Sequence, residues 1–399
     1  MSRLLNLLIL VALATVASGL GQSAKPPDPQ RQTALALEQE GKTPAAEVAW
    51  RAVLKAYPSS AEPYAHLGLL EARQGHYKEA VPLYRKALLM NPTIPGLRLN
   101  LGLALFKGGE PKQAIQEFSI LLESDPPSSP EVQRLNILIG MAHYGLADYG
   151  EAIPFLKKAA ANDTQNLQLR LALAHSCLWT KQNQCVLDVY REILLLDPDS
   201  AEAEMLAGEA LDDMRNNADA ITHFRAAIKA NPKAPNAHFG LGYLLWTLKQ
   251  YREAAGEFQA ELVNDPNHVQ ALLYLGDADI QMNQMDDARP LLEKVVKLDP
   301  SLGLGHLDLG IVFAESDHNP EALRELTLAE KLTPDDVNVH WRLGRLYRTL
   351  GRKEEAKAEL DKANTLNKAV DDDLYKKIAN GRAHHDQTQG PPAVPPDAK

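Results

Sequence analysis

The chain has few of the residues and motifs on which catalysis and metal binding usually depend. Only 2 of its 399 residues are cysteines, and its 12 histidines are scattered along the sequence. It contains no His-Glu-x-x-His, no Gly-rich phosphate loop and no Gly-x-Ser-x-Gly. We therefore expect no metal site, no cofactor and no enzymatic activity.

A basic surface is also lacking. The chain has 42 Lys and Arg against 52 Asp and Glu, which gives a formal net charge of −10. Affinity for nucleic acid depends largely on Lys and Arg at the phosphates, so this class of partner is disfavoured. Beyond the N-terminus, no stretch is long and apolar enough to span a bilayer.

The dominant feature is a pattern that returns every 34 residues. Gly68 and Gly102 are one period apart, and four further periods lead from Gly208 to Gly344. Twelve residues after each of these glycines stands an alanine, and four later a bulky apolar residue. A fixed period of this length is typical of a solenoid of stacked units.

Each unit has the pattern of two helices. Apolar residues follow helical spacing on either side of the turn 74–77, and Asn91-Pro92 ends the second helix. We attribute the small residues Gly68 and Ala80 to a close contact between the two helices. The pattern predicts ten repeats, separated only by a spacer at 129–132: 27–60, 61–94, 95–128, 133–166, 167–200, 201–234, 235–268, 269–302, 303–336 and 337–370.

These units resemble the tetratricopeptide repeat family. The residues at the matching positions of the second repeat are Tyr64, Leu67, Gly68, Ala80, Tyr84, Ala87 and Pro92. The resemblance covers residues 27–370 and implies an all-α fold, an α-solenoid in which antiparallel helix hairpins wind into a right-handed superhelix. The fifth repeat has Ala174 for Gly and Val186 for Ala, so we expect it to pack least regularly.

The two ends of the chain differ from the repeats. Ser2 and Arg3 precede an apolar run and then small residues, which is typical of an export signal over residues 1–21. We therefore expect a periplasmic or secreted protein; the alternative is an uncleaved segment that tethers it to a membrane. Residues 22–26 are interpreted as a linker, 371–381 as a capping helix and 382–399 as a disordered tail.

Both cysteines fall in the fifth repeat. The turn between its two helices can bring Cys177 and Cys185 together, and an oxidising compartment would favour a disulfide. Two small, buried free cysteines are the alternative. The sequence leaves both open.

In several predicted repeats, a row of side chains along one face of the first helix is unusually apolar. We call this row the stripe. The resemblance implies that this stripe lines a concave groove that contacts peptides. Its candidate residues are Leu99, Phe106, Ile137, Met141, Tyr144, Leu171, His175, Trp179, Phe239, Tyr243, Trp246 and Leu273, with Arg345 and Arg348 at a basic end. The alternative is that the aliphatic members pack against the neighbouring repeat as core, whereas the large aromatic ones favour binding.

We expect a non-catalytic scaffold that binds a peptide or amphipathic segment of a partner protein in this groove. An exported scaffold of this kind would serve envelope assembly, secretion or polysaccharide export. A structural solenoid that associates with its own copies is the alternative. An enzyme accessory subunit is disfavoured because the catalytic motifs are missing.

Overall fold

The computed structural model describes residues 29–124 and 129–368. The predicted export signal (1–21), linker (22–26), capping helix (371–381) and tail (382–399) lie outside the described residues. Within these two ranges the chain forms helices and turns without any strand, which confirms the all-α fold.

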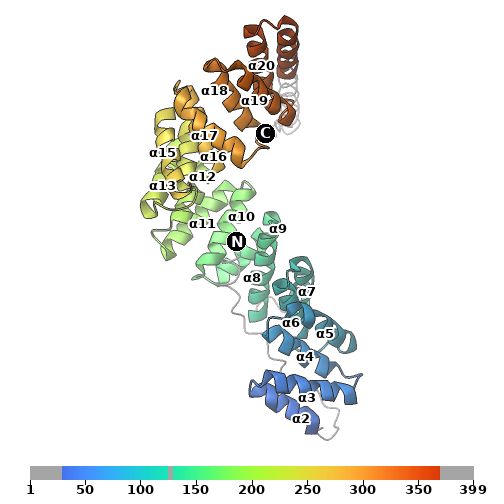
Figure 1. The fold of residues 1–399 in the computed structure, drawn as a ribbon. Coiled ribbons are helices and arrows are strands. Elements are labelled where there is room, and N and C mark those ends of the chain that lie inside the picture. Colours follow the sequence, from blue (N-terminus) through green and yellow to red (C-terminus); the bar gives the residue numbers. More distant parts are fainter. Residues whose placement is uncertain (1–28, 125–128, 369–399) are drawn as a thin grey trace, which may run out of the picture. The chain divides into compact units, whose positions relative to one another are not determined.

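The helices form two compact blocks, one ending at Ala230 and the other beginning at Asn231. In each block the helices pack in antiparallel pairs that follow the order of the chain (Figure 1). The N-terminal block contains α2 (Pro29–Gln39), α3 (Thr43–Ala56), α4 (Ala61–Arg73), α5 (Tyr77–Met90), α6 (Leu97–Lys107), α7 (Pro111–Ser124), α8 (Pro130–Gly145), α9 (Tyr149–Asn162), α10 (Leu167–Trp179), α11 (Asn183–Leu196), α12 (Ala201–Asp213) and α13 (Asn217–Ala230). The C-terminal block contains α14 (Ala237–Thr247), α15 (Tyr251–Asn264), α16 (Val269–Gln281), α17 (Met285–Leu298), α18 (Gly303–Glu315), α19 (Asn319–Leu332), α20 (Val337–Thr349) and a helix over 353–368.

The same turn joins the two helices of each pair. One residue of each turn has a positive φ, whether or not it is glycine: Gly41, Gly75, Gly109, Ala147, Lys181, Arg215, Lys249, Asn283, Asp317 and Gly351. The next amide then bonds to a carbonyl five residues back, as Gln182 N does to Cys177 O at 2.8 Å. This left-handed cap satisfies carbonyls at the end of the first helix and reverses the chain.

The recurrent glycine lies beneath a side chain of the second helix in the same repeat. A Cβ atom on Gly242 would lie 2.8 Å from the ring of Phe258, and one on Gly276 would lie 2.8 Å from Leu292. Phe258 and Leu292 are both fully buried. The expected close contact between the helices is present, because the same Cβ on Gly242 would lie 3.3 Å from the backbone oxygen of Ala254. The glycine also makes room for the side chain above it, a role that was not predicted from the sequence.

The fifth repeat lacks the glycine and is packed differently. Ala174 takes its place, and Tyr190, the counterpart of Phe258, is only partly buried. The Tyr190 hydroxyl instead donates to Glu204 at 3.0 Å, and its ring meets the ring of His223 edge-on. This repeat therefore packs differently from its neighbours.

A polar pair joins the two helices of several repeats. Its members are 19 residues apart in the sequence: Arg98–Glu117, Glu204–His223, His238–Glu257, His306–Glu325 and His340–Glu359. The eighth repeat has Leu272 and Leu291 at these positions. The position therefore accepts either a charged pair or two apolar side chains.

Replacing Gly242 by Ala is expected to lower the free energy of unfolding by about 1–3 kcal/mol, because the new methyl group overpacks the Phe258 ring. Gly256 on α15 is the matched control, since a Cβ there would meet nothing within 4 Å. Gly256→Ala should instead stabilise by about 0.5–1 kcal/mol through helix propensity. Urea denaturation followed by circular dichroism measures both. Equal effects of the two substitutions would show that the ring does not press on α14.

Candidate functional site

The structure divides the predicted stripe into covered and uncovered residues. Leu99, Phe106, Met141, Leu171 and Leu273 are buried in the hydrophobic cores of their blocks. They pack between repeats, as the alternative interpretation of the aliphatic members proposed, and offer no surface to a ligand. Phe106 shows that an aromatic member of the stripe is core as well.

The remaining residues of the stripe in the N-terminal block are at least partly exposed. Trp179 at the end of α10 is 68% exposed, whereas Ile137, Tyr144 and His175 are partly buried. The Trp179 ring stacks on Tyr149, the first residue of α9, with centroids 5.8 Å apart. Tyr149 in turn meets Tyr144 edge-on at 5.9 Å. We call Tyr144, Tyr149 and Trp179 the N-terminal aromatic surface.

Acidic side chains of α12 lie beside this surface. His175 lies next to Tyr144, and its Nε2 atom is 2.8 Å from the Glu202 carboxylate. Lys181, two residues after Trp179, forms an ion pair with Asp213 at 2.6 Å. Burial, followed by the charge of Asp213, raises the pKa of Asp212. The carboxylates of α12 thus outnumber the cations that pair with them, which favours a positively charged ligand.

The C-terminal block has an aromatic cluster of its own. Tyr243 is 37% exposed, and Phe239 and Trp246 on the same helix are partly buried. All three meet Tyr274 of α16, with ring centroids 5.1 Å apart for Tyr243 and 5.0 Å apart for Trp246. We call Phe239, Tyr243, Trp246 and Tyr274 the C-terminal aromatic surface. The T-shaped contacts hold the rings in fixed orientations.

Two carboxylates stand next to this second surface. The Trp246 indole donates to Asp277 at 2.6 Å, which ties α14 to α16. Asp308 of α18 is buried, and its Oδ2 atom has no hydrogen-bond partner within the described residues. Burial raises the pKa of Asp308 well above its usual range; Asp277 raises it further, whereas Arg342 lowers it. The neutral form of the Asp308 carboxyl is therefore favoured.

The predicted arginines lie at the end of the C-terminal block. Arg345 and Arg348 are both exposed on α20. The guanidinium of Arg345 lies over the ring of Trp341, 4.8 Å from its centroid, and Arg342 lies over the same ring at 5.3 Å. This end of the block therefore presents positive charge on an aromatic support.

Cys177 and Cys185 are joined by a disulfide in the structure. Cys177 lies near the end of α10 and Cys185 near the start of α11, and their Cα atoms are 5.9 Å apart, within the range that a disulfide spans. The bond closes the one hairpin that lacks both the glycine and the alanine of the repeat. Cys177 is also two residues before Trp179 on α10.

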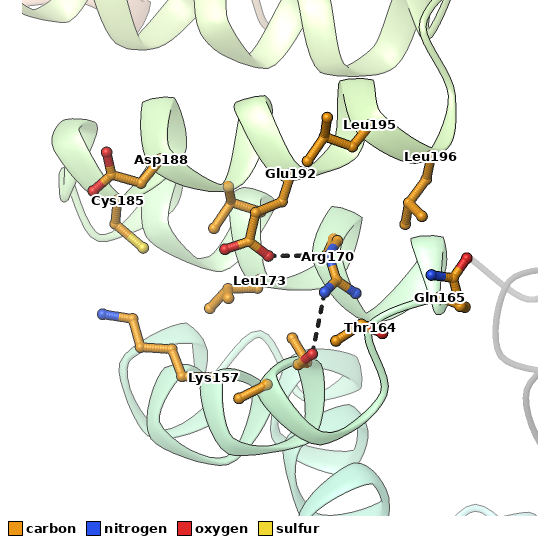
Figure 2. Close-up of a pocket in the computed structure, with 13 residues that line it drawn as sticks. Lys157, Thr164, Gln165, Arg170, Leu173, Cys185, Asp188, Glu192, Leu195 and Leu196 are labelled. Carbon is orange, nitrogen blue, oxygen red and sulfur yellow. Dashed lines mark hydrogen bonds and ion pairs between the residues drawn. The ribbon is translucent and has the colours of Figure 1, made fainter.

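A cleft of about 810 Å³ lies between α9 and α11 (Figure 2). Its apolar wall is formed by Leu173, Val189, Leu195 and Leu196. The buried Arg170 guanidinium donates to the carbonyls of Ala160 and Asp163 and pairs with Glu192 at 3.0 Å. Arg170 thus satisfies carbonyls at the C-terminal end of α9, which is a structural role. The cleft contains no arrangement of nucleophile and base among its described residues.

A second cleft, of about 870 Å³, lies between α15 and α17 in the C-terminal block. Asp279 of α16 is buried at its edge, and burial, followed by the charge of Asp287, raises the pKa of Asp279 to about 6. A perturbed carboxyl group in a cleft is a candidate catalytic acid or base. The side chains that line this cleft include no His, Cys, Ser or Thr to act with it. We interpret Asp279 as a buried group whose charge opposes folding.

Sequence reasoning missed several members of these clusters. Tyr149 belongs to a second helix and Tyr274 to another face of its helix, so a search restricted to one stripe of first helices passed over both. The polar pairs were also missed, although a basic or histidine side chain and a Glu recur 19 residues apart in several repeats. That spacing is visible in the sequence once the period is known.

None of the helices in the two described ranges combines the length and the apolar character that crossing a membrane requires.

Comparisons with known proteins agree on the type of repeat. Sequence profiles described as tetratricopeptide repeat match residues 31–96, 71–136, 133–166, 205–269, 250–303 and 337–370, together more than half of the chain. The TPR repeat-containing protein YpiA of Bacillus subtilis is 26% identical over 64% of this chain and 61% of its own length. The human protein O-mannosyl-transferase TMTC3 is 27% identical over 68% of this chain and 30% of its own length. This chain therefore spans less than two thirds of either relative.

Solved structures include a tetratricopeptide repeat protein from Parabacteroides merdae. It is 17% identical, covers 67% of this chain and 97% of its own, and superposes with a TM-score of 0.47.

Asp279→Asn is expected to stabilise the protein at neutral pH but not in acid. The pKa of Asp279 in the folded state is about 6, above the ordinary 3.8. As the pH falls, the Asp279 carboxylate is therefore protonated in the folded protein before it is protonated in the unfolded chain. The charge of Asp279 therefore opposes folding above pH 6, and this penalty disappears between pH 6 and pH 4. We expect a gain on the order of 1–3 kcal/mol at pH 7 and almost none at pH 4. Urea denaturation at both pH values measures it, with the exposed Asp361→Asn as control. An identical gain at both pH values would contradict this interpretation.

Proposed function

Since the chain belongs to the tetratricopeptide repeat family, we propose that it is an exported, non-catalytic scaffold that binds a segment of a partner protein. Proteins of this family act as protein-interaction scaffolds. The proposed segment is a peptide or an amphipathic stretch of a partner that serves envelope assembly, secretion or polysaccharide export. The aromatic surfaces of the two blocks are the proposed contact sites.

The exposure of Trp179 carries this proposal. A tryptophan that is 68% exposed leaves a large apolar area in water, and its stack on Tyr149 holds the ring in one orientation. Rigid aromatic side chains gain much from burial and lose little conformational entropy on binding. A segment laid across Trp179 and Tyr149 would remove this area from water.

The charge beside the N-terminal aromatic surface points to the kind of segment. Glu202 and Asp213 already pair with His175 and Lys181, whereas Asp212 experiences the negative charge of Asp213. A Lys or Arg side chain of a ligand would relieve this repulsion while its neighbours pack on the aromatic rings. We therefore propose that this surface binds a segment in which basic and apolar residues alternate with a helical or extended period.

The C-terminal block has the opposite charge at its far end. Arg345 and Arg348 are exposed there, and Arg345 stacks on Trp341. Segments with acidic residues fit this end better than the N-terminal aromatic surface. Two surfaces of opposite charge would allow one scaffold to hold two different segments, a common use of repeat proteins.

Trp179→Ala is expected to weaken binding at the N-terminal aromatic surface by about 1–3 kcal/mol, because a central aromatic anchor contributes about this much. The probe is a basic, apolar peptide selected from a displayed random library on the full chain, and fluorescence anisotropy measures its Kd. Leu195→Ala is the matched control, since Leu195 is 85% exposed on α11 away from this surface. Charge reversal at Asp213 should mainly reduce the association rate and its salt dependence.

Circular dichroism separates a binding defect from a folding defect in these variants. If Trp179→Ala unfolds the protein, the ring belongs to the core and the proposal fails. If the variant is folded and binds the peptide as the parent does, the ligand contacts another face. Charge reversal at Arg345 and Arg348 should leave the affinity for this peptide unchanged, and a loss there would move the site to the C-terminal block.

Export is tested on the protein produced with its own N-terminus. We expect N-terminal sequencing of the exported protein to begin near Leu20 or Gln22, because the small residues before these positions suit a signal peptidase. A protein that retains Met1 and sediments with membranes would show that the N-terminal segment is an anchor. A protein that retains Met1 and stays in the cytoplasm would contradict export altogether.

A further inference from the structure

Three side chains with metal-binding atoms meet near the C-terminal end of the described chain. They are Glu330 of α19, His340 of α20 and Glu359 of the helix over 353–368. Their ligand atoms all lie within 4.8 Å of one another. Each side chain comes from a different helix, so the cluster exists only because the last hairpin packs on the preceding one.

The orientation of His340 is that of a metal ligand. The side chain is fully buried, and its Nε2 atom lies 2.7 Å from the carbonyl oxygen of Pro334, to which it donates. Histidines that bind metals usually donate their other ring nitrogen to such an acceptor, which fixes the tautomer. The remaining nitrogen, Nδ1, faces Glu359 at 2.6 Å. Two lone pairs at this distance would repel, so a proton lies between these two atoms when no metal ion is bound.

The preceding repeat supplies an internal comparison. His306 has the same surroundings, with Nδ1 2.7 Å from Glu325 and Nε2 3.1 Å from the carbonyl oxygen of Pro300. The residue that corresponds to Glu330, one period earlier, is Val296. The His–Glu pair is thus part of the repeat, whereas the third ligand is present only beside His340. A structural ion pair does not require Glu330.

We propose that Glu330, His340 and Glu359 bind a divalent transition-metal ion, with Zn²⁺ as the ion that suits them best. One imidazole and two carboxylates match the ligands that Zn²⁺ accepts, and water completes a tetrahedral set. The two carboxylates neutralise the charge of the ion. On binding, the Nδ1 proton of His340 passes to solvent, and the side chains of His340 and Glu359 move apart so that both can bind the ion at about 2.0–2.2 Å.

Lys362 is the cation that competes for this site. Its ammonium group lies 3.5 Å from Glu330, and both side chains are partly exposed. Lys362 is held only at the surface, so its displacement by an ion costs little. The bound ion would join α19, α20 and the last helix and stabilise the C-terminal end of the repeats.

The test uses the full chain with His384 and His385 changed to Ala, so that these two residues contribute no signal. Zn²⁺ alone is the probe for thermal unfolding, and Co²⁺ is the probe for visible d–d absorption. We expect one ion per chain, a higher unfolding temperature with Zn²⁺, and a Co²⁺ band of tetrahedral type. Ligand binding to the folded state raises its stability by mass action.

Glu330→Gln keeps the shape of the side chain and the His340–Glu359 pair but removes one ligand. This variant should fold and bind Zn²⁺ at least tenfold more weakly than the parent. Glu325→Gln, in the corresponding pair of the preceding repeat, is the matched control and should bind Zn²⁺ as the parent does. Absence of any Zn²⁺ effect on the parent, or an equal affinity in Glu330→Gln, would overturn the proposal.

Discussion

Most helix pairs in the described part of the chain share one packing contact, in which a side chain of the second helix rests on the glycine of the first. Phe258 on Gly242 and Leu292 on Gly276 are examples, and both side chains are fully buried. The contact sets the distance between the helices of a pair. Neighbouring pairs can therefore stack with the same spacing, which is the condition for a continuous apolar core in a repeat protein.

The fifth repeat departs from this contact and gains other restraints. Tyr190 is only partly buried, and its hydroxyl donates to Glu204 in the next repeat. A disulfide closes the hairpin, and Arg170 joins α10 to the end of α9. The disulfide is attached to α10 two residues before Trp179. A repeat that is held by covalent and polar links, and that carries the most exposed aromatic residue of the predicted stripe, is a suitable place for a binding surface.

Charge distinguishes the surfaces that the two blocks present. Carboxylates of α12 border the aromatic rings of the N-terminal block, whereas exposed arginines of α20 end the C-terminal block. Apolar contacts supply most of the affinity of such surfaces, and charge decides which partners they accept. The polar pairs within repeats have a different role, because they stand where the eighth repeat has the apolar residues Leu272 and Leu291. Near the end of the described chain, one added carboxylate, Glu330, turns such a pair into a candidate metal site.

The 34-residue repeat pattern determined the all-α solenoid. Its period, its small residues and its helix-ending prolines are all local properties that can be read directly from the sequence. It also indicated the stripe that contains Trp179 and Tyr243. Only the tertiary structure decided which members of that stripe remain exposed, since Leu99 is buried whereas Trp179, at the end of its helix, is not. The contacts of Tyr149 with Trp179 and of Glu330 with His340 likewise join different helices. Helical periodicity fixes the direction of a side chain on its own helix, but the register between neighbouring helices fixes what it meets.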